Sequence, residues 1–263
     1  MFNLSIIFMA LIPFLVAFFS FLSWLLVAML KTSVRGQVKR NAVTTTVVFS
    51  FLIYPTIVNY TFEMFNCIDI EGVTYLKRDF TLECWSGAHV RNILIIGLPV
   101  IIVWVFGFPA FIFRILYKNK ARLNEKNMLI KYGLFYVGLN DRGYYWEVLV
   151  VNIRKILFVG VVVSLTRSSS QLQGMLCFSV LYSTHFMLKQ IKPYNKAYLN
   201  FTDVFSSFAA IVTLLNGIFF MNDENANKND SESLVIFIAV VLFNGAFLCY
   251  WGVRIVMALV VKG

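Results

Sequence analysis

The sequence of 263 residues has few charged side chains, few histidines and few cysteines. Only 14% of the residues are charged and 59% are hydrophobic, which is more apolar surface than a soluble domain of this length can bury. The two histidines, His89 and His185, lie far apart in the sequence, and no CxxC motif or Cys/His cluster accompanies them. We therefore expect neither a metal site nor a cofactor. The same shortage of clustered acids and bases argues against an enzyme.

Long apolar runs are what the chain does have, and they predict an all-α, polytopic transmembrane helical bundle. About 20 mainly apolar residues are needed to span a bilayer as a helix. We expect one membrane domain over residues 1–263 with about seven spans, near 4–30, 42–61, 92–117, 147–165, 172–188, 203–221 and 234–253. Six spans are the alternative if the short fifth segment pairs differently.

The basic residues of the predicted loops orient these spans. One alternate set of loops, 31–41, 117–146, 189–202 and the tail after Val253 without Arg254, holds 14 Lys and Arg, whereas the other set, 62–91, 166–171 and 222–233, holds 5. By the positive-inside rule the first set is cytoplasmic, which places the N-terminus outside and the C-terminus inside. The net charge of +10 then follows from membrane orientation, and we do not expect a nucleic-acid partner.

The largest predicted outer loop, residues 62–91, contains the pair Cys67 and Cys84. An oxidising compartment would allow these two cysteines, 17 residues apart, to form a disulfide. This sidedness favours the plasma membrane or another membrane of the secretory pathway. Cys177 and Cys249 fall inside predicted spans, where small apolar packing residues are the expected role.

The predicted inner loop, residues 118–146, is rich in aromatic residues and glycines, and we call it the elbow. Rings with an apolar body and a polar tip are typical of the membrane-water boundary, and glycines let the backbone turn there. The elbow is therefore predicted to lie at the interface and to lead into the fourth span. Its candidate functional residues are Tyr132, Gly133, Tyr136, Gly138, Tyr145 and Trp146.

Charged residues within the predicted spans form a second candidate site. Arg154 and Lys155 lie seven and eight residues into the fourth span, where an unpaired charge costs about 3 kcal/mol on insertion scales. One hypothesis is a polar cluster in which Glu147, Arg154 and Asp203, beside Lys155, clamp the fourth span to the sixth. The alternative is that both basic side chains reach the inner headgroups.

A family resemblance rests on residues of the outer loop, the elbow and the segment after the fifth span. They are Cys67, Leu76, Asp79, Cys84, Trp85, His89, Lys131, Tyr132, Gly133, Tyr136, Gly138, Tyr145, Trp146, Glu147, Arg154, Lys155, Pro193, Tyr194 and Asn200. Over roughly residues 60–220 the chain resembles the polytopic C-terminal membrane domain of large protist cell-surface proteins. Such domains are described as similar to those of transient receptor potential (TRP) channels. The resemblance implies a membrane module and a possible place in a channel.

Two functions follow from these observations. The first is an anchor, a sensor or a subunit of a larger membrane or cell-surface complex, with the lipid bilayer and a protein partner or a second copy of the chain as its contacts. The alternative is a TRP-like cation-channel subunit, although the 12-residue segment 222–233 is short for a pore loop. Its acidic residues would form either a vestibule ring or a solvated loop: Asp223, Glu224, Asp230 and Glu232.

Overall fold

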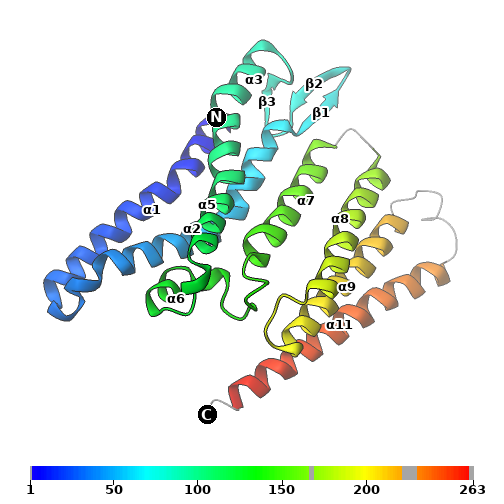
Figure 1. Ribbon diagram of the computed structural model, residues 1–263. Helices are drawn as coiled ribbons and strands as arrows, with labels where there is room; N and C mark the ends of the chain where they lie inside the picture. The colour runs from blue at the N-terminus through cyan, green and yellow to red at the C-terminus, as the bar shows by residue number, and fades with distance from the viewer. Residues whose placement is uncertain (1, 166–168, 221–229, 261–263) are drawn as a thin grey trace. The chain divides into compact units, whose positions relative to one another are not determined.

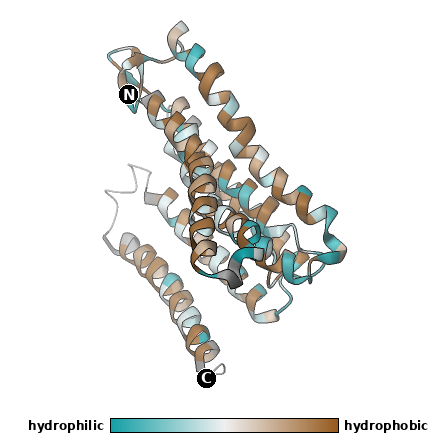
Figure 2. Ribbon diagram, turned by 90° about the vertical axis from the view of Figure 1, so that its left-hand side faces the viewer, coloured by the Kyte–Doolittle hydropathy of each residue, from teal (hydrophilic) through white to brown (hydrophobic). Residues whose placement is uncertain are grey.

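The computed structural model describes residues 2–165, 169–220 and 230–260, which form two compact units, Met1–Arg167 and Ser168–Gly263. Helices dominate both units, and hydrophobic residues run along their length (Figure 2). In the described part of the chain, five helical segments are long and apolar enough to cross a membrane: Leu4–Leu30, Arg35–Phe65, Gly87–Lys118, Ala197–Phe219 and Leu234–Met257. The predicted class, a bundle of membrane helices, is confirmed. The number of spans and their orientation stay predictions.

Unit 1 begins with two long helices that pack against each other (Figure 1). Helix α1 covers Phe2–Leu30, a 3-10 helix η1 covers Thr32–Gln37, and α2 covers Val38–Phe62. Two hydrogen bonds join the pair, from Ser20 Oγ to the Ala42 carbonyl at 3.3 Å and from Trp24 Nε1 to Thr45 Oγ1 at 3.1 Å. Polar side chains thus bond across the pair instead of facing lipid.

The third apolar run forms one continuous helical rod with two π-helical stretches. It consists of α3 (Gly87–Asn92), η3 (Ile93–Gly97), α4 (Leu98–Val100), η4 (Ile101–Gly107) and α5 (Phe108–Lys118). Each π stretch lies just before a proline-containing turn, and proline lacks the N–H that bonds a carbonyl four residues back. For Pro109 that carbonyl belongs to Val105, which accepts a 2.9 Å hydrogen bond from the Tyr54 hydroxyl. A side chain of α2 therefore replaces the missing backbone donor.

Between α2 and the rod lies a small antiparallel sheet that the sequence analysis did not predict. After η2 (Glu63–Phe65), the strands β1 (Cys67–Ile70), β2 (Val73–Leu76) and β3 (Asp79–Glu83) pair in sequence order. The turn between β1 and β2 has two residues, Glu71 and Gly72, with φ of 52° and 85°. Positive φ at both positions is the geometry of the hairpin turns that fit twisted strands.

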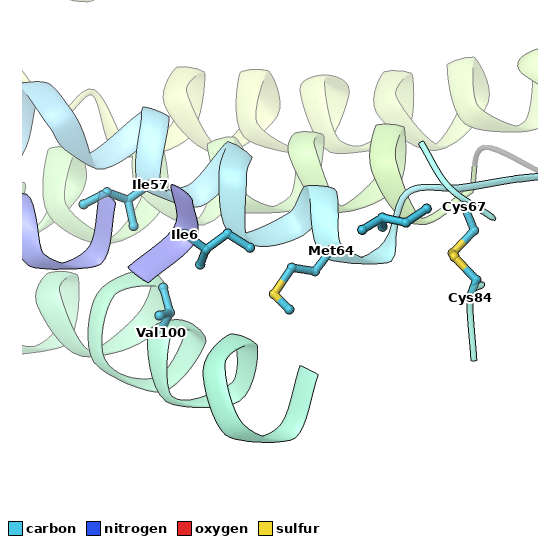
Figure 3. Close-up of a cluster of buried hydrophobic side chains, with 7 residues drawn as sticks. Ile6, Ile57, Met64, Cys67, Cys84 and Val100 are labelled. Carbon is cyan, nitrogen blue, oxygen red and sulfur yellow. A yellow bond between two sulfur atoms is a disulfide. The ribbon is translucent and has the colours of Figure 1, made fainter. Parts of the chain in front are cut away.

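The buried core at this end of unit 1 joins the sheet to the helices. Figure 3 shows Ile6, Ile57 and Val100 near one another, with Met64 between them and the Cys67–Cys84 disulfide. Met64 is 1% exposed, and its sulfur lies so close to Gly97 that an added Cβ there would be 2.9 Å from it. The glycine therefore permits the close approach of η2 and the rod.

The elbow and the last helix of unit 1 complete its core. The elbow contains η5 (Lys120–Arg122), α6 (Lys126–Tyr132) and η6 (Gly133–Phe135), and it leads into η7 (Trp146–Val151) and α7 (Asn152–Ser164). Two further buried clusters hold these elements against α2 and α5. The predicted fourth span coincides with η7 and α7, which are not among the five apolar segments.

Unit 2 consists of α8 (Ser170–Ile191), α9 (Ala197–Phe220) and α11 (Asp230–Val260). Helix α9 packs against both α8 and α11. Between α8 and α9, His185 Nδ1 lies 2.6 Å from Ser207 Oγ, and both side chains are buried. The aromatic contacts between α9 and α11 include Phe205 with Phe247 at 5.8 Å and Phe208 with Phe243 at 5.5 Å.

Candidate functional site: the sheet segment and the elbow

The candidate site is residues 63–91, here called the sheet segment, which combines a rigid frame with exposed apolar side chains. Cys67 and Cys84 are joined by a disulfide, as predicted, with their Cα atoms 6.3 Å apart. Both cysteines are at most 5% exposed, so the crosslink belongs to the core instead of lying on the surface. A chain that is crosslinked and buried at this point holds its neighbouring loops in one conformation.

The disulfide is the first of three contacts, here called ties, that hold the sheet segment in place, and His89 provides the second. Its ring is 1% exposed, Nδ1 accepts a hydrogen bond from the Trp85 N–H at 3.1 Å, and Nε2 lies 3.0 Å from the Met64 carbonyl. Because Nδ1 is an acceptor and a carbonyl cannot donate, the neutral ring must carry its proton on Nε2. One side chain thus bonds η2, the short helix after α2, to the turn that precedes α3.

Trp85, in that turn, has an unusual backbone conformation and an exposed ring. Its φ is 63°, a region that residues with a side chain rarely adopt, and the bond to His89 helps to hold it there. The indole is 59% exposed and meets the His89 ring edge to face at 5.9 Å. Strain at an exposed aromatic residue is typical of binding sites, where a fixed side chain binds with little loss of entropy.

A salt bridge forms the third tie. Glu63, at the end of α2, accepts from Arg78 Nη2 at 2.7 Å and lies 2.6 Å from Arg78 Nε, which is a two-point contact. The Arg78 guanidinium also lies 5.2 Å from the centre of the Tyr60 ring. The hydrogen bond to Glu63 raises the pKa of Arg78 above its ordinary value. The turn between β2 and β3 is therefore fixed to α2.

The frame leaves several large apolar side chains of the sheet segment exposed. Phe80 of β3 is 58% exposed, and Ile70 and Val73, cross-strand neighbours beside the β1–β2 turn, are 41% and 37% exposed. Figure 1 shows β1 and β2 projecting sideways from the end of α2, beside α3. Exposed aromatic residues on a polar, rigid segment are characteristic of protein-binding surfaces.

Three aromatic rings of the elbow are buried within unit 1, and the interfacial position of the elbow stays a prediction. Trp146 and Phe135 are each 2% exposed, and Phe135 packs edge to face on Phe51 at 5.3 Å. Tyr136 donates a 2.7 Å hydrogen bond to the Leu123 carbonyl, and burial raises the pKa of its phenol. These rings fix the elbow against α2 and α5.

The remaining elbow residues are placed by backbone geometry and ring contacts. Gly138 has φ of 93°, as a glycine-specific turn requires, and a Cβ added at Gly133 would lie 3.1 Å from the Val137 side chain. Tyr132 and Tyr145 are half-buried, and Tyr145 meets the Tyr144 ring edge to face at 5.7 Å. Within the described residues, the buried Trp146 Nε1 has no hydrogen-bond partner.

The proposed polar cluster draws residues from both units. Glu147, Arg154 and Lys155 lie on η7 and α7 and are partly buried, and Lys155 Nζ lies 5.6 Å from the centre of the Phe51 ring. In unit 2, Asp203 of α9 accepts a 3.2 Å hydrogen bond from the Tyr194 hydroxyl. The cluster stays a prediction. The proposed acidic ring, which includes Asp223 and Glu224, lies outside the residues whose side chains are described.

Sequence reasoning missed three of these features. The Glu63–Arg78 pair is 15 residues apart, the two bonds of His89 involve backbone groups, and Ser207 carries no charge. The contacts Glu63–Arg78, Met64–His89 and His185–Ser207 join residues 15 to 25 positions apart, beyond the few residues over which helix or strand patterns operate. The His89–Trp85 bond spans only four residues, but it involves a backbone N–H that no side-chain pattern reveals. The spacing of Cys67 and Cys84 was the one sequence signal for this site, because it indicated that the loop between α2 and the rod is folded and closed by a disulfide.

Comparison with known proteins yields two relatives of limited similarity. The chain is 23% identical over 203 residues, 72% of its length, to the Toxoplasma gondii protein named cysteine repeat modular protein A. It is 28% identical over 137 residues, 50% of its length, to flavin carrier protein 1 of Saccharomyces cerevisiae. It spans only 6% and 16% of these two proteins. The chain matches no known family profile and no solved structure.

The first of these relatives supports the coarse part of the predicted resemblance, since it is a cysteine-repeat protein of a protist. Neither name mentions a TRP channel, so the TRP-like part of the resemblance stays a prediction.

Proposed function

We propose that this chain is a multi-pass membrane module that holds a protein partner through its sheet segment, as an anchor or subunit of a larger membrane complex. The observation that carries the proposal is the exposure of Phe80 and Trp85 on a segment fixed by three independent ties. A rigid aromatic anchor loses little conformational entropy on binding. The predicted orientation puts this segment outside the cell or in a lumen.

The test compares partner retention between two matched variants of the full chain. Trp85→Gly removes the indole and suits the positive φ, so the frame should be preserved while the anchor is lost. Combined with Phe80→Ser, it should abolish co-purification of the partner from gently solubilised membranes of the native cell. The control is Leu94→Ala with Ile95→Ala, two exposed apolar residues on η3 in a span. Equal retention by both double variants would contradict the proposal.

The alternative functions require flux across the membrane. A TRP-like cation-channel subunit should pass calcium or sodium into liposomes, and a carrier of the kind named for the yeast relative should take up a flavin. Liposomes containing the purified chain should show neither flux above empty liposomes if the module only anchors a partner. Cation flux would favour the channel, and flavin uptake would favour the carrier.

A further inference from the structure

A groove between α1 and α2 in unit 1 has a volume of about 1100 Å³. Its long walls are apolar and include Ala17, Phe21 and Leu25 of α1 and Val43 and Val47 of α2. Small-molecule sites commonly measure about 300–1,000 Å³, so the groove has room for a ligand with a long apolar part.

The groove has a cationic end, where η1 connects the two helices. Arg35 and Lys39 line it, and both are exposed. Arg35 Nε donates a 3.1 Å hydrogen bond to the Ala28 carbonyl near the end of α1, which anchors the guanidinium beside the groove. In the described part of the chain, neither residue pairs with a carboxylate, and no Asp or Glu occurs in the sequence before Glu63.

The walls of the groove are fixed rather than formed by chance separation of two helices. The hydrogen bonds from Ser20 to Ala42 and from Trp24 to Thr45 set the spacing of α1 and α2. Helix α6 is held to α2 by a 3.1 Å bond from Thr44 Oγ1 to the Ile130 carbonyl, and it contributes Tyr132 to the lining. A hollow that is held open in this way is preorganised for an occupant.

The combination of long apolar walls with an uncompensated cationic end selects an amphiphilic anion. We propose that the groove binds one membrane phospholipid with an anionic headgroup, its phosphate beside Arg35 and Lys39 and an acyl chain along α1 and α2. A small soluble anion would leave the apolar walls unused, and a polypeptide would find few backbone partners on two complete helices. Anionic phospholipids are concentrated in the cytoplasmic leaflet, the side on which the predicted orientation places this end. This inference does not depend on the function proposed for the sheet segment.

The headgroup contact is tested by lipid selectivity of the full chain. Native mass spectrometry of the purified chain in detergent with equal amounts of dioleoylphosphatidylserine and dioleoylphosphatidylcholine should show preferential retention of phosphatidylserine. Arg35→Gln with Lys39→Gln should reduce that preference about 30-fold, the effect expected for removing two basic residues from an anionic lipid. Lys118→Gln with Lys120→Gln removes the same charge from exposed residues outside the groove and should change it less than about threefold.

The apolar part of the site has its own pair of variants. Ala17→Trp fills the groove far from the cationic end, and it should lower the amount of either phospholipid bound without changing charge. Ala110→Trp places the same side chain at an exposed position of α5 that does not line the groove, and it should leave binding unchanged. Glycerophosphoserine, which has the headgroup without acyl chains, should not displace the bound phospholipid.

Several outcomes would overturn the proposal. If both charge variants lose the preference for phosphatidylserine equally, the lipid is attracted to basic surface in general and not to the groove. If Ala17→Trp retains as much phospholipid as the wild-type chain, no acyl chain lies in the groove. Displacement by glycerophosphoserine would indicate a site for a soluble phosphate ester. Should the Arg35 and Lys39 variant fail to fold, as judged by thermal unfolding, the comparison of Ala17→Trp with Ala110→Trp decides the question.

Discussion

Replacing His89 by alanine should loosen the whole sheet segment, because this one ring bonds two backbone groups that are far apart in sequence. The substitution leaves the Met64 carbonyl and the Trp85 N–H without their partner. An unsatisfied buried polar group costs about 1–3 kcal/mol. The Trp85 N–H is only partly buried, so water can replace part of its lost bond, whereas the Met64 carbonyl is buried and pays the larger cost. We therefore expect the free energy of local opening to fall by about 2–4 kcal/mol.

Hydrogen-deuterium exchange measures this opening directly. With a factor of ten for each 1.4 kcal/mol, amides of β1 and β3 should exchange about 30- to 700-fold faster in His89→Ala than in the wild-type chain. His89→Gln keeps a donor that can reach the Met64 carbonyl and should give an intermediate rate. Val90→Ala, a change at the partly exposed neighbouring residue, is the control and should alter exchange less than about threefold.

The result that refutes the reasoning is exchange in His89→Ala within about threefold of the wild type, because the ring would then contribute too little to hold the segment. The consequence for binding is equally specific. A freed Trp85 would leave its left-handed backbone conformation, so partner retention should fall in His89→Ala even though the indole is still present.

Replacing both Cys67 and Cys84 by alanine should destabilise the sheet segment by about 3 kcal/mol in the loop-entropy view, and reduction of the wild-type chain should reproduce most of the loss in thermal unfolding. Tyr136→Phe removes a hydrogen bond that contributes about 1 kcal/mol to the stability of the folded chain. Burial raises the pKa of Tyr136 in the folded chain. The stabilisation by the protonated phenol is therefore complete below the ordinary tyrosine pKa of about 10, and it is lost as the pH rises through the raised pKa. Stabilities of the two proteins should therefore converge in alkaline solution. Asp203→Asn and Arg154→Gln should each lower the melting temperature in detergent, with the double variant losing less than the sum if the two side chains meet. Additive losses would leave contact of Arg154 with lipid headgroups as the better account.

The helices were predictable because their signal is local. Within the described residues, each of the seven predicted spans lies mainly on helical structure, and α1 begins two residues before the predicted run and ends with it at Leu30. Hydrophobic length determines such a segment without reference to the rest of the chain. The π-helical stretches before Pro99 and Pro109 were not predicted, since proline indicates a lost backbone bond but not how neighbouring residues replace it.

The candidate site was only partly predictable. The spacing of Cys67 and Cys84 indicated a closed loop, whereas the sheet inside it was missed because its strands have only four or five residues and carry no sustained alternation. The elbow aromatics are predicted to lie at the interface, and the burial of Trp146 within unit 1 was not foreseen. Amphipathic rings suit both places, and composition does not distinguish them.

Sequence alone determined the class of this protein, because the free energy of placing an apolar helix in lipid depends on its own residues. It also indicated the basic end of the first helix pair and the cysteine pair. Only the tertiary structure decided what these features do together. The bond of His89 to Met64, and the placement of Arg35 and Lys39 at the end of an apolar groove, depend on how separate segments pack. Packing is a property of several segments at once, so no single stretch of sequence encodes it.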